Sequence, residues 1–107
     1  GAKKVIGIDI CPEALEHAEK NAKVNHLSIS FTDAIPTLSS NSLFLMNMIF
    51  PEQKAVMKED FPTPSQWITS GILEEQQDTY LKVTEQWGCK LLEIRKKNGW
   101  LGFRFEK

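Results

Sequence analysis

A short β-branched run that leads directly into a helical segment constrains the fold most strongly. Residues 5–10 read Val-Ile-Gly-Ile-Asp-Ile, without the alternation of a strand that has one solvent face. Such a run is typical of a strand covered on both faces, as in a parallel sheet. Pro12 follows at a position that the first turn of a helix tolerates. We therefore expect a strand and helix of an α/β protein here.

The rest of the chain continues the alternation of strands and helices. Apolar residues at helical spacing, with acids early and lysines late, predict a helix from Pro12 to about Asn25. The later patterns predict strands at 27–32, 43–48 and 67–69, a helix from Pro51 to about Asp60, a helix capped by Ser70, and strands at 89–95 and 100–105.

The last two predicted strands are joined by Asn98-Gly99, which favours a hairpin turn because both residues accept positive φ. One face of this hairpin is expected to be buried, through Leu92, Ile94, Leu101, Phe103 and Phe105. The predicted fold is α/β, with a mostly parallel sheet and an antiparallel hairpin at its C-terminal edge.

Composition narrows the class of protein. A chain of 107 residues matches one domain, and its 41% apolar and 25% charged residues are ordinary for a soluble globular protein. A net charge of −1 provides no general attraction to nucleic acid or anionic lipid. The longest nearly apolar stretch, residues 43–50, is too short to span a bilayer. Two cysteines without CxxC spacing favour a reducing compartment, so we expect a cytoplasmic protein.

Polar side chains stand at the ends of three predicted strands, and in open α/β sheets ligands bind beyond those ends. Asp9 could accept hydrogen bonds from ribose hydroxyls, and Asp33, with Ala34 beside it, from an adenine amino group. Each acid could instead cap a helix or a turn. Asn47 interrupts an apolar run, so it is either a ligand-binding amide or a core asparagine bonded to backbone.

Other groups of residues give weaker indications of a functional site. His17 and His26 lack metal partners at suitable spacing, neither cysteine has a nearby base, and Ser70-Gly71 lacks the context of a hydrolase nucleophile. The last twenty residues hold six basic and two acidic side chains. This basic hairpin could face ribosomal RNA, but lysines that protect an edge strand explain it more simply, and no clear nucleic-acid site emerges.

Several segments carry a resemblance to a known superfamily. Residues 1–10, 12–14 and 21–25 resemble the second strand and helix of class I S-adenosylmethionine-dependent methyltransferases. Met46-Asn47-Met48-Ile49 resembles the Ala-Asn-Ile signature, and residues 69–76 resemble the Ser-Gly-Ile-Leu segment, of the lysine methyltransferases that modify large-subunit ribosomal protein eleven. The closing segments around Trp87 and Trp100 fit the hairpin of that family.

The resemblance implies roles for particular residues. It places Asp9 and the adjacent Ile10 on the ribose of S-adenosylmethionine, Asp33 and Ala34 near the adenine, and Asn47 at the methionine end and the amine substrate. The implied reaction is transfer of the sulfonium methyl group to an amine of a ribosomal protein. This chemistry depends mainly on aligning a deprotonated amine with the methyl group, so the absence of a catalytic triad does not count against it.

The sequence also departs from the family. The first strand and its Gly-rich loop, which hold the methionine part of the cofactor, would precede Gly1, as would the family's N-terminal substrate-recognition domain. The missing strand is central in the family's sheet, so two apolar edges should be left. We therefore expect a truncated Rossmann-like sheet, one partial domain over residues 1–107, that is either rearranged or paired in an intertwined homodimer.

Two alternatives to the methyltransferase interpretation remain open. One is a non-catalytic interaction module, a fold remnant that self-associates through exposed sheet edges. The other is an NAD-binding domain with Asp9 on the ribose, although such domains also need the Gly-rich turn. Without that turn, cofactor binding and activity in these residues are expected to be weak or absent.

Overall fold

The computed structural model describes residues 1–57 and 64–107. Its contacts divide the chain into two compact units, Gly1–Thr37 and Leu38–Lys107. The elements, in chain order, are β1 (Ile6–Ile8), α1 (Pro12–Val24), β2 (Ser30–Thr32), β3 (Leu43–Asn47), α2 (Phe50–Val56), β4 (Gln66–Leu73), the 3₁₀ helix η1 (Glu74–Gln76), α3 (Gln77–Gln86), β5 (Lys90–Lys97) and β6 (Trp100–Glu106). This order of strands and helices matches the sequence prediction.

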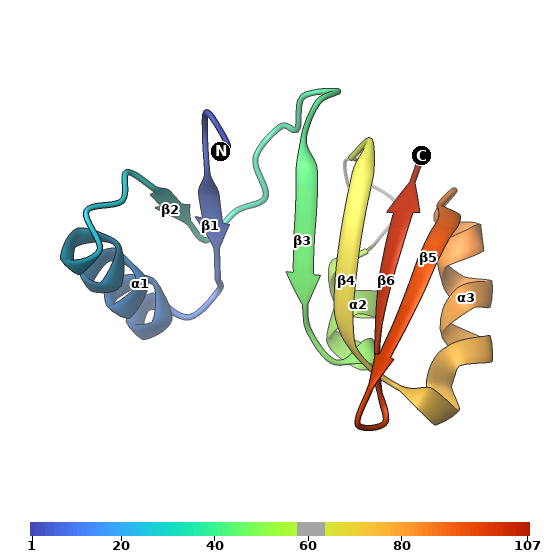
Figure 1. The fold of residues 1–107 in the computed structure, drawn as a ribbon. Coiled ribbons are helices and arrows are strands. Elements are labelled where there is room, and N and C mark those ends of the chain that lie inside the picture. The colour runs from blue at the N-terminus through green and yellow to red at the C-terminus, as the bar shows by residue number, and fades with distance from the viewer. Residues whose placement is uncertain (58–63) are drawn as a thin grey trace. The chain divides into compact units, whose positions relative to one another are not determined.

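The first unit is a parallel strand pair connected by one helix (Figure 1). Helix α1 has Pro12 in its first turn and an i,i+4 ion pair of 2.8 Å between Glu16 and Lys20, as the charge order predicted. Strands β1 and β2 pair over only three residues each, fewer than the six predicted for each strand. The register sets Gly7 opposite Phe31, and the Phe31 ring occupies the space that a side chain at Gly7 would need.

The second unit is built on a four-stranded sheet in the order β3-β4-β6-β5. Strands β3 and β4 are parallel, whereas β6 runs antiparallel to both β4 and β5. The hairpin turn is the predicted one, with φ of 52° at Asn98 and 80° at Gly99. This combination of parallel strands and a closing antiparallel hairpin confirms the expected fold class.

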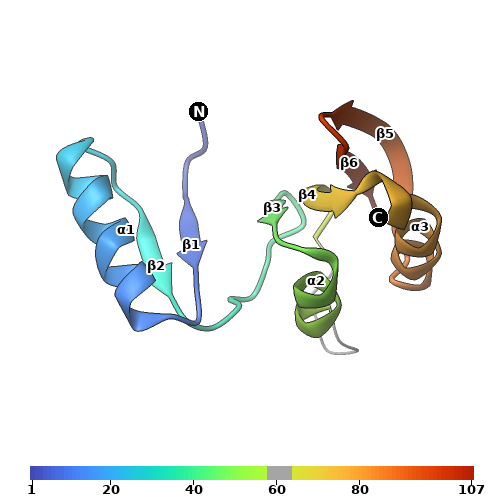
Figure 2. The ribbon, with the colours of Figure 1, turned by 90° about the horizontal axis from the view of Figure 1, so that it is seen from below.

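Helices α2 and α3 lie on the same side of this sheet (Figure 2). The core beneath them is rich in aromatic rings, because alternate residues of β4 and β6 point inward. Tyr80 of α3 is fully buried, with its ring 4.8 Å from Phe103 and 5.3 Å from Phe50 between centroids. Each such ring contact contributes roughly 0.5–1.5 kcal/mol of stability beyond that from burial of the ring surface.

Two local predictions are wrong. Ser70 was expected to cap a helix, but it lies inside β4, which extends to Leu73. Leu92 was expected on the buried face of the hairpin, yet it is 40% exposed. The reason is a register shift between Leu91 and Glu93, which breaks the alternation of the strand. The predicted end of the second helix, near Asp60, falls outside the described residues.

Strands β1 and β3 each have one partner within residues 1–57 and 64–107. The described strands therefore form two separate sheets, and β1 and β3 each leave one edge unpaired among the described residues. Apolar side chains on β3 are exposed, to 52% for Leu43 and 67% for Leu45. None of the described helices combines the length and apolar character that a membrane span requires.

Candidate functional site

Asp9 and Asp33 follow the carboxyl ends of the two parallel strands of the first unit, at the same edge of their sheet. The Asp9 amide donates to the Thr32 carbonyl at 3.2 Å, which extends the strand pairing by one bond. Oδ1 of Asp9 accepts a 2.8 Å bond from the Cys11 amide just before α1. This bond is the turn contact that the sequence left open for Asp9. The second carboxylate oxygen has no partner among the described residues.

Ile10 and Ala34 accompany the two acids. Ile10 is 89% exposed, and the Ala34 amide donates to Thr32 Oγ1 at 3.2 Å. Asp33 is also exposed. The structure therefore gathers four of the five predicted site residues at one edge of the first unit, and the fifth, Asn47, belongs to the second unit.

Asn47 is the last residue of β3 and lies opposite Ser70 in the parallel register. Its side chain is exposed, and its Oδ1 accepts a 2.9 Å hydrogen bond from Ser70 Oγ. Asn47 is therefore not a buried core asparagine, which was the simpler of the two interpretations of this residue. Its Nδ2 hydrogens and the second lone pair of Oδ1 have no protein partner among the described residues, so the amide can bind a ligand.

Gly71 brings the backbones of β3 and β4 into close contact beside Asn47. It has a φ of +91°, and a Cβ at this position would lie 2.5 Å from the carbonyl oxygen of Met48. The register shift between Ser70 and Ile72 is centred on this glycine. Only glycine fits such a bulge without strain. A glycine within a strand is itself a signal for close backbone approach, so the sequence contained this clue.

A series of hydrogen bonds among buried side chains connects helices α2 and α3 to these strand ends. Gln53 Nε2 donates to the carbonyls of Met48, at 2.7 Å, and Ser70, at 2.9 Å. Tyr80 Oη donates to Gln53 Oε1 at 2.7 Å and lies 2.7 Å from Thr69 Oγ1. Burial raises the pKa of Tyr80 to about 12, so its hydroxyl keeps the proton that it donates to Gln53. Gln53 lies in a short polar stretch of sequence that gave no sign of burial.

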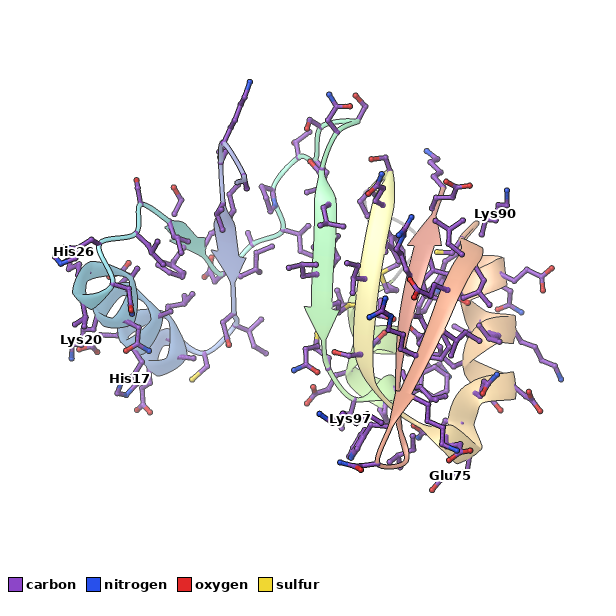
Figure 3. The ribbon with its side chains drawn as sticks, viewed as in Figure 1. His17, Lys20, His26, Glu75, Lys90 and Lys97 are labelled. Atoms are coloured by element: carbon purple, nitrogen blue, oxygen red, sulfur yellow. The ribbon has the colours of Figure 1, made fainter. Side chains whose placement is uncertain are left out.

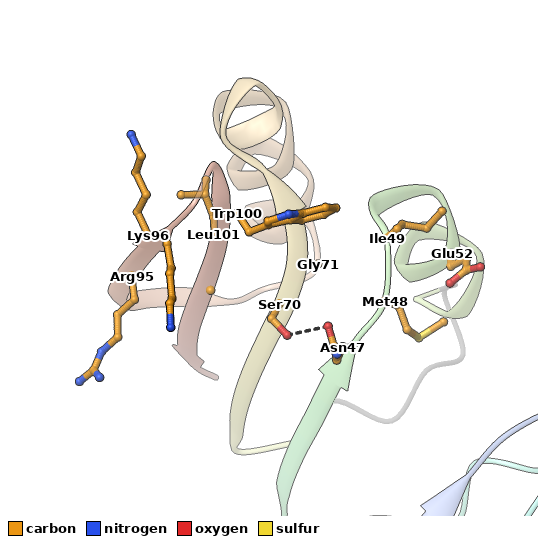
Figure 4. Close-up of a pocket in the computed structure, with 12 residues that line it drawn as sticks. Asn47, Met48, Ile49, Glu52, Ser70, Gly71, Arg95, Lys96, Trp100 and Leu101 are labelled. Atoms are coloured by element: carbon orange, nitrogen blue, oxygen red, sulfur yellow. Dashed lines mark hydrogen bonds between the residues drawn. The ribbon is translucent and has the colours of Figure 1, made fainter. Parts of the chain in front are cut away.

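An open pocket of about 770 Å³ lies beside Asn47 and Ser70 (Figure 4). The Trp100 ring extends from the start of β6 across β4 toward the Met48–Ile49 segment (Figure 4). Trp100 is 47% exposed and supplies an aromatic surface at the pocket. The lining residues are Asn47, Met48, Ile49, Glu52, Ser70, Gly71, Arg95, Lys96, Lys97, Trp100, Leu101 and Gly102. The sequence did not indicate Trp100 as a site residue.

Three of the six basic side chains in the last twenty residues are paired with acids that the structure describes. Glu106 lies 3.4 Å from Lys90, Glu93 lies 2.7 Å from Arg95, and Lys96 pairs with Glu74. The bond to Arg95 lowers the pKa of the partly exposed Glu93 carboxyl. Lys90 and Lys97 lie at opposite ends of β5 (Figure 3). These contacts favour a solvated edge strand over a concentrated nucleic-acid surface.

The remaining titratable side chains among residues 1–57 and 64–107 do not assemble a second site. His17 and His26 are both exposed on the first unit (Figure 3). The described residues contain no cluster of three or more histidine, cysteine, aspartate or glutamate side chains that could bind a metal ion. Cys11 and Cys89 are free thiols, and burial raises the pKa of Cys89 to about 11, which disfavours its reactive thiolate.

Comparison with known proteins identifies the family. The family model of ribosomal protein L11 methyltransferase (PrmA) matches residues 1–107. The chain belongs to the ribosomal protein L11 methyltransferase family. A relative of that name from Dictyoglomus thermophilum is 39% identical over 110 residues, which cover 94% of this chain and 35% of the relative. The protein of the same name from Dictyoglomus turgidum is 34% identical over 106 residues, covering 94% of this chain and 36% of the relative.

Solved structures support the fold independently. A ribosomal protein L11 methylase from Lactobacillus delbrueckii subsp. bulgaricus matches with a TM-score of 0.84 at 22% identity, over 100% of this chain and 59% of that chain. The 16S rRNA methylase RmtB matches with a TM-score of 0.72 at 11% identity, over 97% of this chain and 47% of that chain. This chain therefore has the methyltransferase fold but spans only about a third of the length of its curated L11 methyltransferase relatives.

Proposed function

We propose that this chain is part of an S-adenosylmethionine-dependent methyltransferase that methylates an amine, such as a lysine side chain, of a ribosomal protein. Ribosomal protein L11, named in its relatives, is the proposed substrate. The observation that carries this proposal is the family match over residues 1–107. The placement of Asn47 at the carboxyl end of a parallel strand, beside an open pocket, supports it.

The first unit offers groups that suit the nucleoside part of the cofactor. Asp9 keeps one carboxylate oxygen without a protein partner, and the ribose hydroxyls are donors that a carboxylate accepts well. Asp33 and Ala34, at the same sheet edge, would face the adenine, and the exposed Ile10 could cover the ribose. When bound, S-adenosylmethionine supplies a methyl group activated by its sulfonium sulfur. Residues 1–107 contain no Gly-x-Gly motif, so we expect weak binding.

The second unit offers groups that suit the amine. The Asn47 amide is exposed and held by Ser70, so its oxygen can accept a hydrogen bond from the amine and orient the nitrogen lone pair. The apolar face of Trp100 can contact the aliphatic stem of a lysine side chain. In the reaction the nitrogen lone pair forms the new N–CH₃ bond, the electrons of the broken C–S bond remain on sulfur, and a proton leaves the methylated amine.

Cofactor binding can be tested by isothermal titration calorimetry with S-adenosylmethionine and its demethylated product, S-adenosylhomocysteine. We expect measurable heat for the wild-type chain and its loss in Asp9→Ala. Asp78→Ala changes an exposed acid of α3 and serves as the control. Absence of heat at millimolar ligand would contradict cofactor binding by these residues and favour a non-catalytic interaction module.

Methyl transfer can be tested with radiolabelled S-adenosylmethionine and purified ribosomal protein L11. We expect labelling that falls about tenfold or more in Asn47→Ala, because the amine loses its orienting acceptor. Asn41→Ala alters another exposed asparagine, just before β3, and should leave labelling unchanged. Equal loss of labelling in both variants would contradict a specific role for Asn47.

We further propose that the isolated chain forms a homodimer through β3. The supporting observations are the open edge of β3 and the exposed Leu43 and Leu45 on this strand. Light scattering after size exclusion should give twice the chain mass, and Leu45→Lys should shift the protein toward monomer. A monomeric wild type at high concentration would refute this assembly.

Two broader expectations belong to the same proposal. We propose that the two compact units are parts of one partial methyltransferase domain, which amide exchange would reveal as a single cooperative unfolding step. We also propose a cytoplasmic location, since Cys11 and Cys89 are free thiols and the proposed substrate is a ribosomal protein.

A further inference from the structure

We propose that Gln53 is a positioning residue for Asn47, acting through the backbones of the two strands that meet at the pocket. The idea rests on the proposed function, since it assigns Gln53 a role in presenting the Asn47 amide to a substrate. Gln53 does not line the pocket; it lies on α2, beneath the strand ends.

The buried Gln53 side-chain amide bonds to the backbones of both strand ends, and we call this pair of hydrogen bonds the clamp. The side chain is 0% exposed, and its single nitrogen bonds to the carbonyl of Met48 on one side and that of Ser70 on the other. Carbonyl oxygens only accept hydrogen bonds, so these two contacts fix which end of the amide is nitrogen. The direct backbone bond between the Met48 amide and the Ser70 carbonyl is 3.3 Å long, so Gln53 reinforces a weak point of the strand pairing.

The two clamped residues determine where Asn47 lies. Met48 follows it directly in the chain, and Ser70 donates its hydroxyl to the Asn47 side-chain oxygen at 2.9 Å. A displacement of either carbonyl would therefore change the orientation of the Asn47 amide. Gly71 allows the Met48 carbonyl to approach closely from the other strand, since a Cβ at residue 71 would lie only 2.5 Å from the carbonyl oxygen.

Tyr80 and Thr69 hold the clamp in one orientation. The Tyr80 hydroxyl donates to Gln53 Oε1, and it can then only accept from Thr69 Oγ1. All three side chains are at most 1% exposed, so water cannot replace a lost partner. The hydrogen bonds thus run in one direction, from Thr69 through Tyr80 and Gln53 to the two carbonyls beside the pocket. Chains of this kind in a dry interior strengthen one another.

The experiment is nuclear magnetic resonance of the full chain, with the Asn47 side-chain amide and the Ser70 and Gly71 backbone amides as reporters. Gln53→Met keeps the size of the side chain and removes the clamp. We expect it to shift all three reporters. Gln66→Met changes an exposed glutamine at the start of β4 and should leave the reporters in place.

Tyr80→Phe provides a second variant in case Gln53→Met does not fold, because it keeps the ring and removes only the hydroxyl that anchors Gln53. It should shift the same reporters in the same direction, by less. If the Asn47 signals of the folded variants coincide with those of the wild type, the inference is wrong.

A kinetic measurement separates positioning from simple destabilisation. In the methyl-transfer assay, Gln53→Met should lower kcat by about tenfold and by no more than Asn47→Ala does, while the KM for S-adenosylmethionine stays within about twofold. Loss through instability would instead follow the folded fraction, and raising that fraction by cooling would restore the rate relative to the wild type at the same temperature. An inactive wild type would contradict the proposed function alone, because the resonance shifts still decide the role of Gln53.

Discussion

Replacing Gly71 by alanine tests how tightly β3 and β4 meet beside the pocket. The added Cβ would lie 2.5 Å from the Met48 carbonyl oxygen and 2.8 Å from its carbon, and the backbone has a φ of +91°. Left-handed backbone costs an L-residue about 1–2 kcal/mol, and forcing a methyl group into a filled space costs about 1–3 kcal/mol more. We therefore expect Gly71→Ala to lower the free energy of unfolding by about 2–5 kcal/mol.

Gly88→Ala is the matched control. Gly88 has a similar φ of +78°, but nothing lies within 4 Å of a Cβ at that position. It should show the backbone strain without the clash, so Gly71→Ala should cost about 1–3 kcal/mol more than Gly88→Ala. Urea unfolding followed by circular dichroism measures both, with comparable m-values as the check on two-state behaviour. Equal losses in the two variants would refute the close approach of Gly71 to Met48.

Three further predictions follow from how deeply particular side chains are buried. Because burial raises the pKa of Tyr80 from 10.0 to about 12, the folded state keeps a proton that the unfolded state releases. The free energy of unfolding should be unaffected by this group below pH 10 and fall by up to about 1.4 kcal/mol per pH unit between pH 10 and about 12; denaturant titrations should show that Tyr80→Phe removes this part of the slope. Phe105→Ala should cost about 3–5 kcal/mol in urea unfolding, since Phe105 is 1% exposed. Leu92→Ala should cost less than about 1 kcal/mol, and a loss as large as that of Phe105→Ala would show that Leu92 is buried after all.

Much of the fold could be predicted because its signals are local. Helix α1 follows from Pro12 and the charge order over 13 residues, and the last hairpin follows from the tolerance of Asn98 and Gly99 for positive φ. The family resemblance predicted an unpaired edge at β1 and at β3, and each of these strands has one partner among the described residues. Strand lengths were predicted less well, because pairing partners rather than local preference set where a strand ends.

The candidate site, like the fold, could be predicted only in part. Asp9, Asp33 and Asn47 could be found because strand ends in an α/β sheet are recognisable from the sequence. The structure added what those residues contact: Cys11 for Asp9, and Ser70 for Asn47. Their roles in binding and catalysis remain predictions.

The sequence by itself determined the order of elements, the α/β class and the residues at the strand ends, since these depend on periodicity and backbone preference within a few neighbouring positions. Only the tertiary structure decided that Ser70 belongs to a strand, that Leu92 faces solvent and that Gln53 is buried. Gln53 bonds to residues 17 and 27 positions away, at Ser70 and Tyr80. A buried polar side chain is stable only when such distant partners satisfy it, and no local pattern in the sequence records them.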